Sequence, residues 1–324
     1  MKKLAMLVLV LAIVLGVGAQ NKAGWPEQLK FMAGPPGGNW FALGTALSEL
    51  WSKNVLQTTS STGGGVANIL NTDLKKGDFG FSVVSLVGAA LAAEEDFANK
   101  DIKNVVVMAN LYTQYTYYIV RKDFADKHGI KSFDDLVNKN VPVRFATLKP
   151  GTASEFVIKA MFKKGYGTDY EKLKKKGWTF EFTSYENGAD LMADNHLDLF
   201  AFSVGKVASI VMNIESSTPI YILPLGQQAL DALAKAYGTT TFTIEPGFYK
   251  SVKEPVKTIG DYNCIVVRKD LPDSLVFELN KAMWANKASI VAAVKDFGEL
   301  TIKDALPANL PAHPGSVQFW KQAK

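Results

Sequence analysis

Short apolar segments alternate with segments of helical periodicity along this chain, and this alternation limits its fold more than any other feature of the sequence. The segment DFGFSVVS at 78–85 is typical of a strand, and it follows a helical pattern that begins at Val66. The second half repeats the order of helix, aspartate and Phe-Ser-Val strand in ADLMADNHLDLFAFSV at 189–204. The alternation therefore predicts an α/β fold with a small strand–loop–helix sheet in each half.

Two lobes joined by crossing strands are the predicted domain organisation. The 324 residues suffice for one large or two medium domains, and no long linker separates the two halves. We expect residues 20–116 together with 226–324 to form the first lobe, and residues 117–225 to form the second. The loops that follow strands in an open α/β sheet lie at its carboxyl edge, where ligands bind.

The N-terminus has the pattern of a secretory signal peptide. Two lysines at 2–3 precede an apolar run at 4–14, and Val-Gly-Ala at 17–19 is a small-residue cleavage site. The run is too short for a membrane-spanning helix, and an uncleaved anchor is the alternative. We therefore expect residues 1–19 to be removed near Ala19 and the protein to reside in the periplasm.

The charge and the cysteine and histidine content exclude several classes of protein. The net charge of +5 is spread along the chain, and the basic run KLKKKG at 172–177 suits a solvated helix end better than a nucleic-acid interface. The single Cys264 excludes an intramolecular disulfide, and the histidines at 128, 196 and 313 lack metal-ligand spacing. We expect a monomer without a metal, a cofactor or a nucleic-acid partner.

The stretch TTSSTGGGVANIL at 58–70 is a glycine-rich loop with several hydroxyl side chains. A nucleotide phosphate loop needs a lysine after its last glycine, but Val66 follows Gly65. A dinucleotide fingerprint needs an acidic residue at the end of the next strand, where FSVVS stands. What remains is a helix N-terminus whose free N–H groups can bind a carboxylate or another oxyanion. A capped turn that merely needs flexible glycines is the alternative.

Two further loops share this donor-rich character. GPPGGNW at 34–40 combines backbone accessibility at its glycines with a polar Asn39 and an aromatic Trp40. TLKPGTAS at 147–154 begins a helix in the second half and follows a strand that contains Arg144. This arginine can form a bidentate pair with a carboxylate ligand or, alternatively, a salt bridge on the lobe surface.

The expected crossover between the lobes is crowded with tyrosines at 112, 115, 117 and 118, of which one or two are expected to face the cleft. No nucleophile elbow, paired histidine or carboxylate pair stands out, so we expect a binding protein rather than an enzyme. The predicted ligand-binding residues are Gly38, Asn39, Trp40, Ser61, Thr62, Gly64, Gly65, Asn68, Ser85, Tyr115, Thr147, Lys149, Gly151, Thr152, Ser154 and Ser203, with Arg144 as a candidate carboxylate partner.

The order of these segments resembles the TAXI-type solute receptors of tripartite ATP-independent periplasmic (TRAP) transporters. The blocks that carry the resemblance are GPPGGNWFALGTALSELW, STGGGVANI, KKGDFGFSVVS, VRFATLKPGTAS, the long segment from IEPGFY to NKAMW, and PAHPGSVQFW. They cover nearly the whole chain after the signal peptide. The resemblance implies a two-lobed periplasmic-binding-protein fold (Venus flytrap, type II) that closes on a small organic anion of the glutamate, dicarboxylate or 2-oxo acid class. It also implies delivery to a sodium-coupled TRAP permease in the membrane.

The family's motifs fall on the glycine-rich loops of this chain. Its aromatic pair falls on Asn39 and Trp40, its Thr-Gly-Gly-Ser-x-x-Asn loop on residues 62–68, and its Gly-Ser-Gly-Thr loop on 151–154. Three positions depart from the family pattern: Asn39 replaces an aromatic residue, Gly65 replaces a serine, and Leu86 replaces an aspartate. An ABC-type receptor for a small oxyanion or sulfonate, a ligand sensor and an exported enzyme are the alternatives.

Overall fold

The computed structural model describes residues 22–324, so the predicted signal peptide lies outside the described residues. The strands are β1 (Leu29–Met32), β2 (Thr58–Ser61), β3 (Phe79–Val83), β4 (Val105–Arg121), β5 (Arg144–Leu148), β6 (Thr179–Thr183), β7 (Leu199–Gly205), β8 (Ile220–Ile222), β9 (Thr240–Ile244) and β10 (Val256–Arg268). The helices are α2 (Asn39–Asn54), α3 (Gly65–Asp73), α4 (Val84–Leu91), α5 (Lys122–His128), α6 (Phe133–Asn138), α7 (Ala153–Ala160), α8 (Tyr170–Lys174), α9 (Tyr185–Ala193), α10 (Ser209–Ser217), α11 (Gln227–Tyr237), α12 (Asp273–Ala285), α13 (Lys287–Ala293) and α14 (Pro314–Gln322), with short turns η1 (Glu95–Phe97), η2 (Met161–Gly165) and η3 (Lys295–Glu299).

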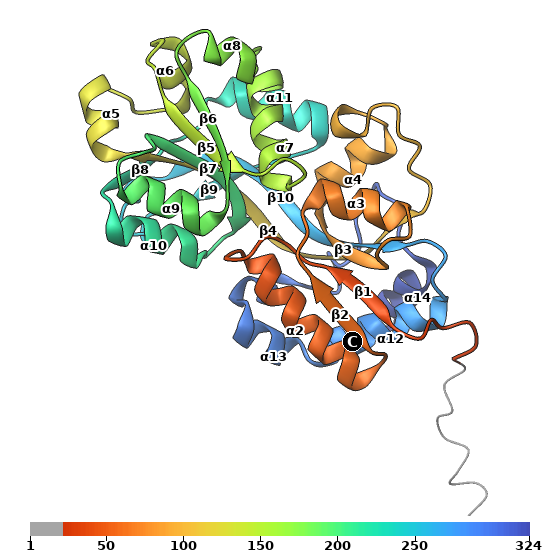
Figure 1. Ribbon diagram of the computed structural model, residues 1–324. Helices are drawn as coiled ribbons and strands as arrows, with labels where there is room; N and C mark the ends of the chain where they lie inside the picture. Colours follow the sequence, from red (N-terminus) through yellow and green to blue (C-terminus); the bar gives the residue numbers. More distant parts are fainter. Residues whose placement is uncertain (1–21) are drawn as a thin grey trace, which may run out of the picture.

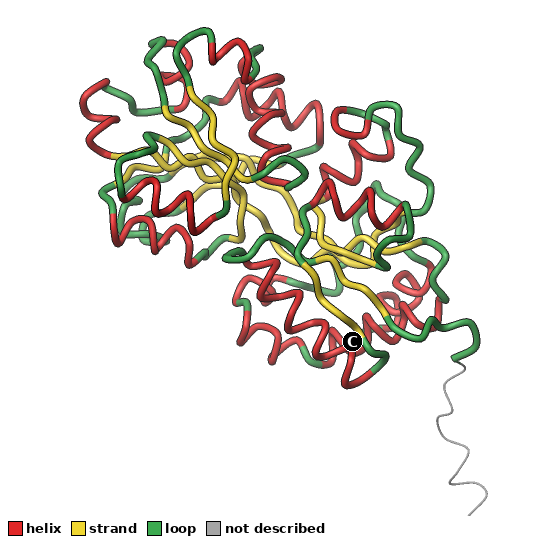
Figure 2. Tube along the Cα trace, viewed as in Figure 1, coloured by secondary structure: helices red, strands yellow, loops and turns green. Residues whose placement is uncertain are grey.

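One continuous sheet runs through two lobes, in the order β2-β1-β3-β10-β4-β7-β5-β6. Strands β1, β2 and β3 are parallel in one lobe, and β5, β6 and β7 are parallel in the other. The two long strands β4 and β10 are antiparallel to each other and pass between the lobes (Figure 1). Figure 2 shows helices packed on both sides of the strands in each lobe. The predicted α/β fold is therefore confirmed.

Both lobes bury their central strands completely, which explains why these strands read as continuous apolar runs. Every residue of β3 and every residue of β7 is buried. In the first lobe, Phe31, Trp51 and Phe79 form an aromatic cluster in which the rings of Trp51 and Phe79 meet edge to face at 5.1 Å. This rigid packing holds the loops at the carboxyl ends of the strands in place.

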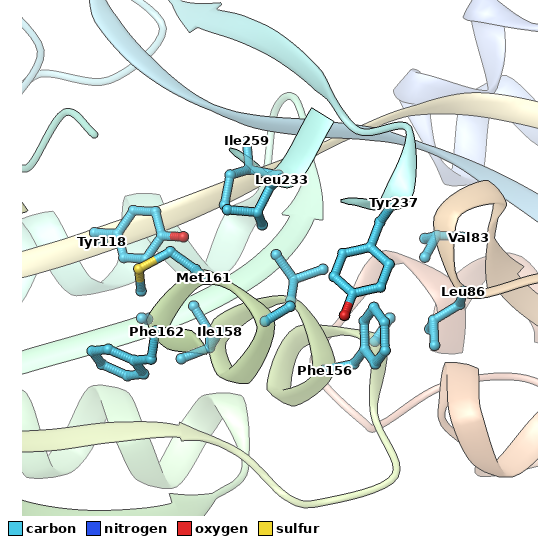
Figure 3. Packing of buried hydrophobic residues seen from close by; sticks show 14 of the residues in the cluster. Val83, Leu86, Tyr118, Phe156, Ile158, Met161, Phe162, Leu233, Tyr237 and Ile259 are labelled. Carbon is cyan, nitrogen blue, oxygen red and sulfur yellow. The ribbon is translucent and has the colours of Figure 1, made fainter. Parts of the chain in front are cut away.

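A single hydrophobic cluster extends from the second lobe into the first. Phe156 of α7 packs against Tyr237 of α11 with ring centroids 5.5 Å apart. Figure 3 shows these two rings beside Val83 and Leu86, which belong to the first lobe. Apolar contact therefore contributes to holding the lobes together on this side.

Residues 226–255 pack with the second lobe. Leu233 of α11 lies in the cluster that contains Met161, and Tyr249 donates a hydrogen bond to the Tyr117 hydroxyl at 3.2 Å. The chain then enters β10, which pairs with β9 at its start and with β3 at its end. We therefore propose that the chain returns to the first lobe within β10, near Thr258, rather than at residue 226.

Within residues 22–324, no helix is long and apolar enough to cross a membrane.

Candidate functional site

A small cavity of about 30 Å³ lies where the two lobes meet. The first lobe contributes the start of α2 and the glycine loop before α3, and the second contributes the starts of α7 and α9 and the end of β7. Side chains of β4 and β10 complete the wall. The lining residues are Pro35, Gly38, Asn39, Trp40, Gly64, Tyr112, Gln114, Leu148, Thr152, Ala153, Ser154, Tyr185, Ser203, Val204, Gly205 and Asn263.

The glycine loop before α3 touches the second lobe directly. The backbone N–H groups of Val66 and Ala67 both donate to the carbonyl of Gly151 at 3.2 Å. A Cβ on Gly64 would lie 2.7 Å from this same carbonyl oxygen, so only glycine permits the approach. These two N–H groups at the start of α3 were predicted to bind an anion, but they bond the second lobe instead.

Asn68 holds this loop from within the first lobe and does not reach the cavity. Its Nδ2 lies 2.8–3.0 Å from the carbonyl oxygens of Met32, Ala33 and Phe81, and its Oδ1 accepts from the N–H of Gly64 at 3.1 Å. The side chain is fully buried. Asn68 therefore fixes the end of β1, the middle of β3 and the glycine loop in one arrangement.

The start of α7 presents polar groups to the cavity. Thr152 caps the helix, because its hydroxyl accepts from the N–H of Glu155 at 3.2 Å and donates to the carbonyl of Lys149 at 2.8 Å. The N–H groups of Ala153 and Ser154 have no carbonyl partner within the helix, because the first turn of any α-helix leaves its N–H groups free. Together with the helix dipole, they give this wall a partial positive charge.

Ser154 also ties α7 to β7. Its hydroxyl donates to the carbonyl of Ser203 at 3.2 Å and accepts from the N–H of Ser203 at 2.9 Å. Tyr185 donates to the same carbonyl at 3.0 Å. The side chains of Ser154 and Tyr185 and the backbone of Ser203 therefore form one hydrogen-bonded wall of the second lobe.

The opposite wall is a chain of hydrogen bonds between α2 and the crossing strands. Trp40 Nε1 donates to Asn263 Oδ1 at 2.7 Å, and Asn263 Nδ2 donates to the carbonyl of Tyr112 at 3.1 Å. The Tyr112 side chain is buried and its hydroxyl has no hydrogen-bond partner among the described residues. Burial raises the pKa of Tyr112 well above its ordinary value, so its hydroxyl stays protonated and can donate.

At Gln114, strand β4 has β10 on one side and β7 on the other. Gln114 pairs with Asp261 of β10 and with Gly205 of β7. Its side chain lines the cavity and is almost completely buried. The cavity therefore sits at the point where the sheet passes from one lobe to the other.

The structure brings together part of the predicted site. The predicted residues that line the cavity are Gly38, Asn39, Trp40, Gly64, Thr152, Ser154 and Ser203. The lining residues that were not predicted from the sequence are Pro35, Tyr112, Gln114, Leu148, Ala153, Tyr185, Val204, Gly205 and Asn263. Tyr112 carried a signal, because it belongs to the tyrosine cluster at the crossover, whereas Gln114 and Asn263 are not distinguished from the other polar residues of their strands.

Arg144 does not line the cavity. It is the first residue of β5, whereas Leu148 at the other end of the strand lines the cavity, about 13 Å away along a strand of this length. Its guanidinium bonds Asp198 at 2.6 Å and also the side chain of Asn195. It forms a salt bridge at the edge of the second lobe, as the alternative interpretation had it.

The other predicted residues outside the lining have different surroundings. Ser61, Thr62 and Lys149 are exposed, whereas Thr147 is fully buried. The Tyr115 ring packs on Phe242 at 4.9 Å. The residues outside the lining are Ser61, Thr62, Gly65, Asn68, Ser85, Tyr115, Thr147, Lys149 and Gly151, besides Arg144.

Ser85 is paired with a buried carboxylate in β10. Asp261 accepts from the Ser85 hydroxyl, from the Ser85 N–H at 3.4 Å and from the Tyr262 N–H at 2.7 Å. Burial raises the pKa of Asp261 to about 6. The folded protein therefore binds this proton more tightly than the unfolded chain, and between about pH 4 and pH 6 stability falls as the pH rises.

Asp261→Asn is expected to stabilise the protein at pH 7.5 and not at pH 4.5. At the higher pH the native carboxylate is charged and buried, a cost of about 1–3 kcal/mol for a shift of this size. Urea unfolding of native and variant protein at both pH values measures the difference. The exposed Asp194→Asn is the matched control and should change stability at neither pH; a variant that is no more stable at pH 7.5 than the native protein contradicts the assignment.

Among residues 22–324, no group of three or more histidine, cysteine, aspartate or glutamate side chains is placed to hold a metal ion. His313 is buried and bonds the backbone on both ring nitrogens, to Leu271 O at 3.1 Å and from the Gly315 N–H at 3.2 Å. It has a structural role at the start of α14.

Comparison with known proteins identifies a family and a fold. The sequence model of the NMT1-like family matches residues 31–323. A search of curated proteins gave no match. The structure of the periplasmic binding protein BugD aligns over 92% of this chain and 94% of its own, with 15% identity and a TM-score of 0.54.

Two further solved structures have similar values. MatC from Rhodopseudomonas palustris, solved with bound malate, is 12% identical over 92% of this chain and 97% of its own, with a TM-score of 0.55. PhnD1 from Prochlorococcus marinus, solved with methylphosphonate, is 15% identical over 84% of this chain and 90% of its own, with a TM-score of 0.53. At such identities the likeness concerns the fold, and the predicted two-lobed periplasmic-binding-protein fold is confirmed.

Proposed function

The chain belongs to the NMT1-like family, and on this premise we propose that it is a periplasmic solute-binding protein that captures a small organic anion between its lobes. It then delivers this anion to a transporter in the membrane. Binding shifts the equilibrium between separated and closed lobes toward the closed form, which the membrane partner recognises.

The cavity between the lobes is the observation that carries this proposal. Its wall combines Trp40 and Gly64 of the first lobe, Ser154 and Ser203 of the second, and Tyr112 of a crossing strand. Because each lobe supplies only part of the wall, a ligand makes all of its contacts only when the lobes are closed. Ligand binding is therefore coupled to lobe closure.

The polar groups of the cavity suit an anion. The starts of α2 and α7 both face it, and a helix start attracts negative charge through free N–H groups and the helix dipole. The resemblance to TAXI-type receptors favours glutamate, a dicarboxylate or a 2-oxo acid, and the malate held by MatC, a protein of the same fold, agrees with this class. The same resemblance favours a TRAP-type secondary permease as the partner.

An ABC-type receptor for a small oxyanion is the second candidate. The cavity of about 30 Å³ is small, and PhnD1, which has the same fold, holds methylphosphonate. The carboxylate and oxyanion classes therefore belong in one screen.

The contacts within the cavity favour a receptor over an enzyme. The Ser154 hydroxyl donates its proton to the backbone carbonyl of Ser203 and accepts from the Ser203 N–H, and the Ser203 hydroxyl lies 2.9 Å from Thr116 Oγ1. Among the described residues that line the cavity, no histidine, lysine or carboxylate is present to activate either serine. We therefore propose that the bound anion leaves unchanged.

A thermal-shift screen tests the proposed function. The panel contains glutamate, malate, succinate, pyruvate, alkanesulfonates, methylphosphonate and phosphate, each added to the purified protein. A ligand that binds the folded state stabilises it by mass action, so at 100 times Kd about 2.7 kcal/mol and a rise in Tm are expected. The absence of a rise in Tm with every compound of the panel contradicts the receptor assignment, and chemical conversion of one of them would indicate an enzyme instead.

A further inference from the structure

The Tyr112 hydroxyl is a buried donor at the cavity, without a partner among the described residues. A buried hydroxyl normally finds a partner, because leaving it unpaired costs free energy. Tyr112 is 2% exposed and lines the cavity, and its hydroxyl has no partner among the described residues. A ligand oxygen in the cavity is therefore the natural acceptor for this hydroxyl.

The described residues that line the cavity are all uncharged. Among the described residues that line it, the donors are neutral side chains such as Gln114 and the first N–H groups of α7 at Ala153 and Ser154. Neutral donors at a helix start can compensate one carboxylate. Two buried negative charges without a cation would carry a much larger desolvation cost.

A protein carboxylate stands directly behind one wall of the cavity. Asp296 Oδ2 accepts from Asn39 Nδ2 at 2.9 Å, and a Cβ on Gly205 would lie 1.9 Å from the same oxygen. Burial and the neighbouring Glu299 raise the pKa of Asp296 to about 6, so at pH 7.5 it is mostly charged. A second carboxylate on the ligand would be repelled by it.

From these three observations, and resting on the proposed function, we propose that the ligand is a small monocarboxylate with one negative charge. Its carboxylate accepts from the Tyr112 hydroxyl and from the first N–H groups of α7, and its uncharged remainder lies on the side of Asn39 and Gly205. Among the anion classes proposed above, the chemistry of this cavity therefore favours monocarboxylates and disfavours dicarboxylates, including the malate that the likeness to MatC alone would favour.

Calorimetric titrations with matched pairs of acids test this selectivity. One pair is L-lactate and L-malate, and the other is propionate and succinate. The two members of each pair differ by one carboxylate. At pH 7.5, the monocarboxylate of at least one pair is expected to bind about tenfold or more tightly than its partner. Tighter or equal binding of the dicarboxylate in every pair overturns the inference and leaves the receptor function standing, whereas failure of every anion in the screen to bind overturns both.

Tyr112→Phe tests the anchoring hydroxyl. Since this hydroxyl has no protein partner, the variant should fold with a Tm close to that of the native protein, and the Kd for the monocarboxylate should rise about 10- to 100-fold. Tyr118→Phe is the matched control, because Tyr118 lies on the same strand with an equally buried and unpartnered hydroxyl but packs against Phe133, away from the cavity.

Tyr118→Phe should leave the Kd for the monocarboxylate unchanged. An unchanged Kd in Tyr112→Phe, or an equal loss in both variants, overturns the role of Tyr112. Asp296→Asn provides an independent readout, since removing this charge should narrow the preference for the monocarboxylate in each pair. An unaltered preference in that variant overturns the part of the inference that assigns the selection to Asp296.

Discussion

Replacing Asn68 by alanine is expected to lower the free energy of unfolding by about 3–5 kcal/mol. The side chain is fully buried and bonds the carbonyl oxygens of Met32, Ala33 and Phe81 and the N–H of Gly64. Alanine leaves these backbone groups without partners and without water. Each such group costs about 1–3 kcal/mol when left unpaired.

Urea unfolding followed by circular dichroism measures this loss. Asn71→Ala is the matched control, because it removes the same side chain from the same helix at a position that is only half-buried. It should change stability by no more than about 0.5 kcal/mol. A loss of less than about 1 kcal/mol in the free energy of unfolding of Asn68→Ala would show that β1 and β3 do not depend on this side chain.

Replacing Gly64 by valine is expected to weaken ligand binding about tenfold or more. The φ of Gly64 is −167°, an extended conformation that valine adopts readily, so the backbone itself is not strained. However, a Cβ at this position lies 2.7 Å from Gly151 O and 3.1 Å from Thr152 Cα, both backbone atoms of the second lobe. The lobes must separate to make room, and the closed form loses about 1–3 kcal/mol.

Titration of the strongest ligand from the thermal-shift screen measures this effect. Gly88→Ala is the matched control, because Gly88 lies in the helical part of the first lobe and a Cβ there meets nothing within 4 Å. Binding by this control should equal that of the native protein. If Gly64→Val also binds with native affinity, closure of the lobes through Gly64 and Gly151 is not required for binding.

The architecture of this protein could be predicted from the sequence because it depends on local patterns. Buried parallel strands read as apolar runs, and the repeated order of strand, loop and helix predicts two lobes. The sequence predicts a separate small sheet in each half, whereas β4 and β10 join the strands of both lobes into one sheet. Loops rich in glycine, serine and threonine were expected at the carboxyl ends of the strands, and the loops at 34–40 and 147–154 do meet at the cavity. The loop at 58–70 meets it only through Gly64.

The roles of individual site residues could not be predicted, because they depend on contacts between distant parts of the chain. Nothing near Val66 in the sequence shows that Gly151 supplies the acceptor for its N–H. Arg144 is plausible as a ligand residue until Asp198 is placed beside it by the pairing of β5 with β7. The tyrosines at the crossover are alike in sequence, and only the strand register decides that Tyr112 lines the cavity.

The central claim is that a small carboxylate binds between the lobes, and a crystal structure of the complex tests it most directly. The account predicts the carboxylate within about 2.7–3.2 Å of the Tyr112 hydroxyl and of the first N–H groups of α7. Density instead in the groove of about 470 Å³ on the second lobe, beside Lys131, Tyr221 and Val252, with none between the lobes, would contradict it.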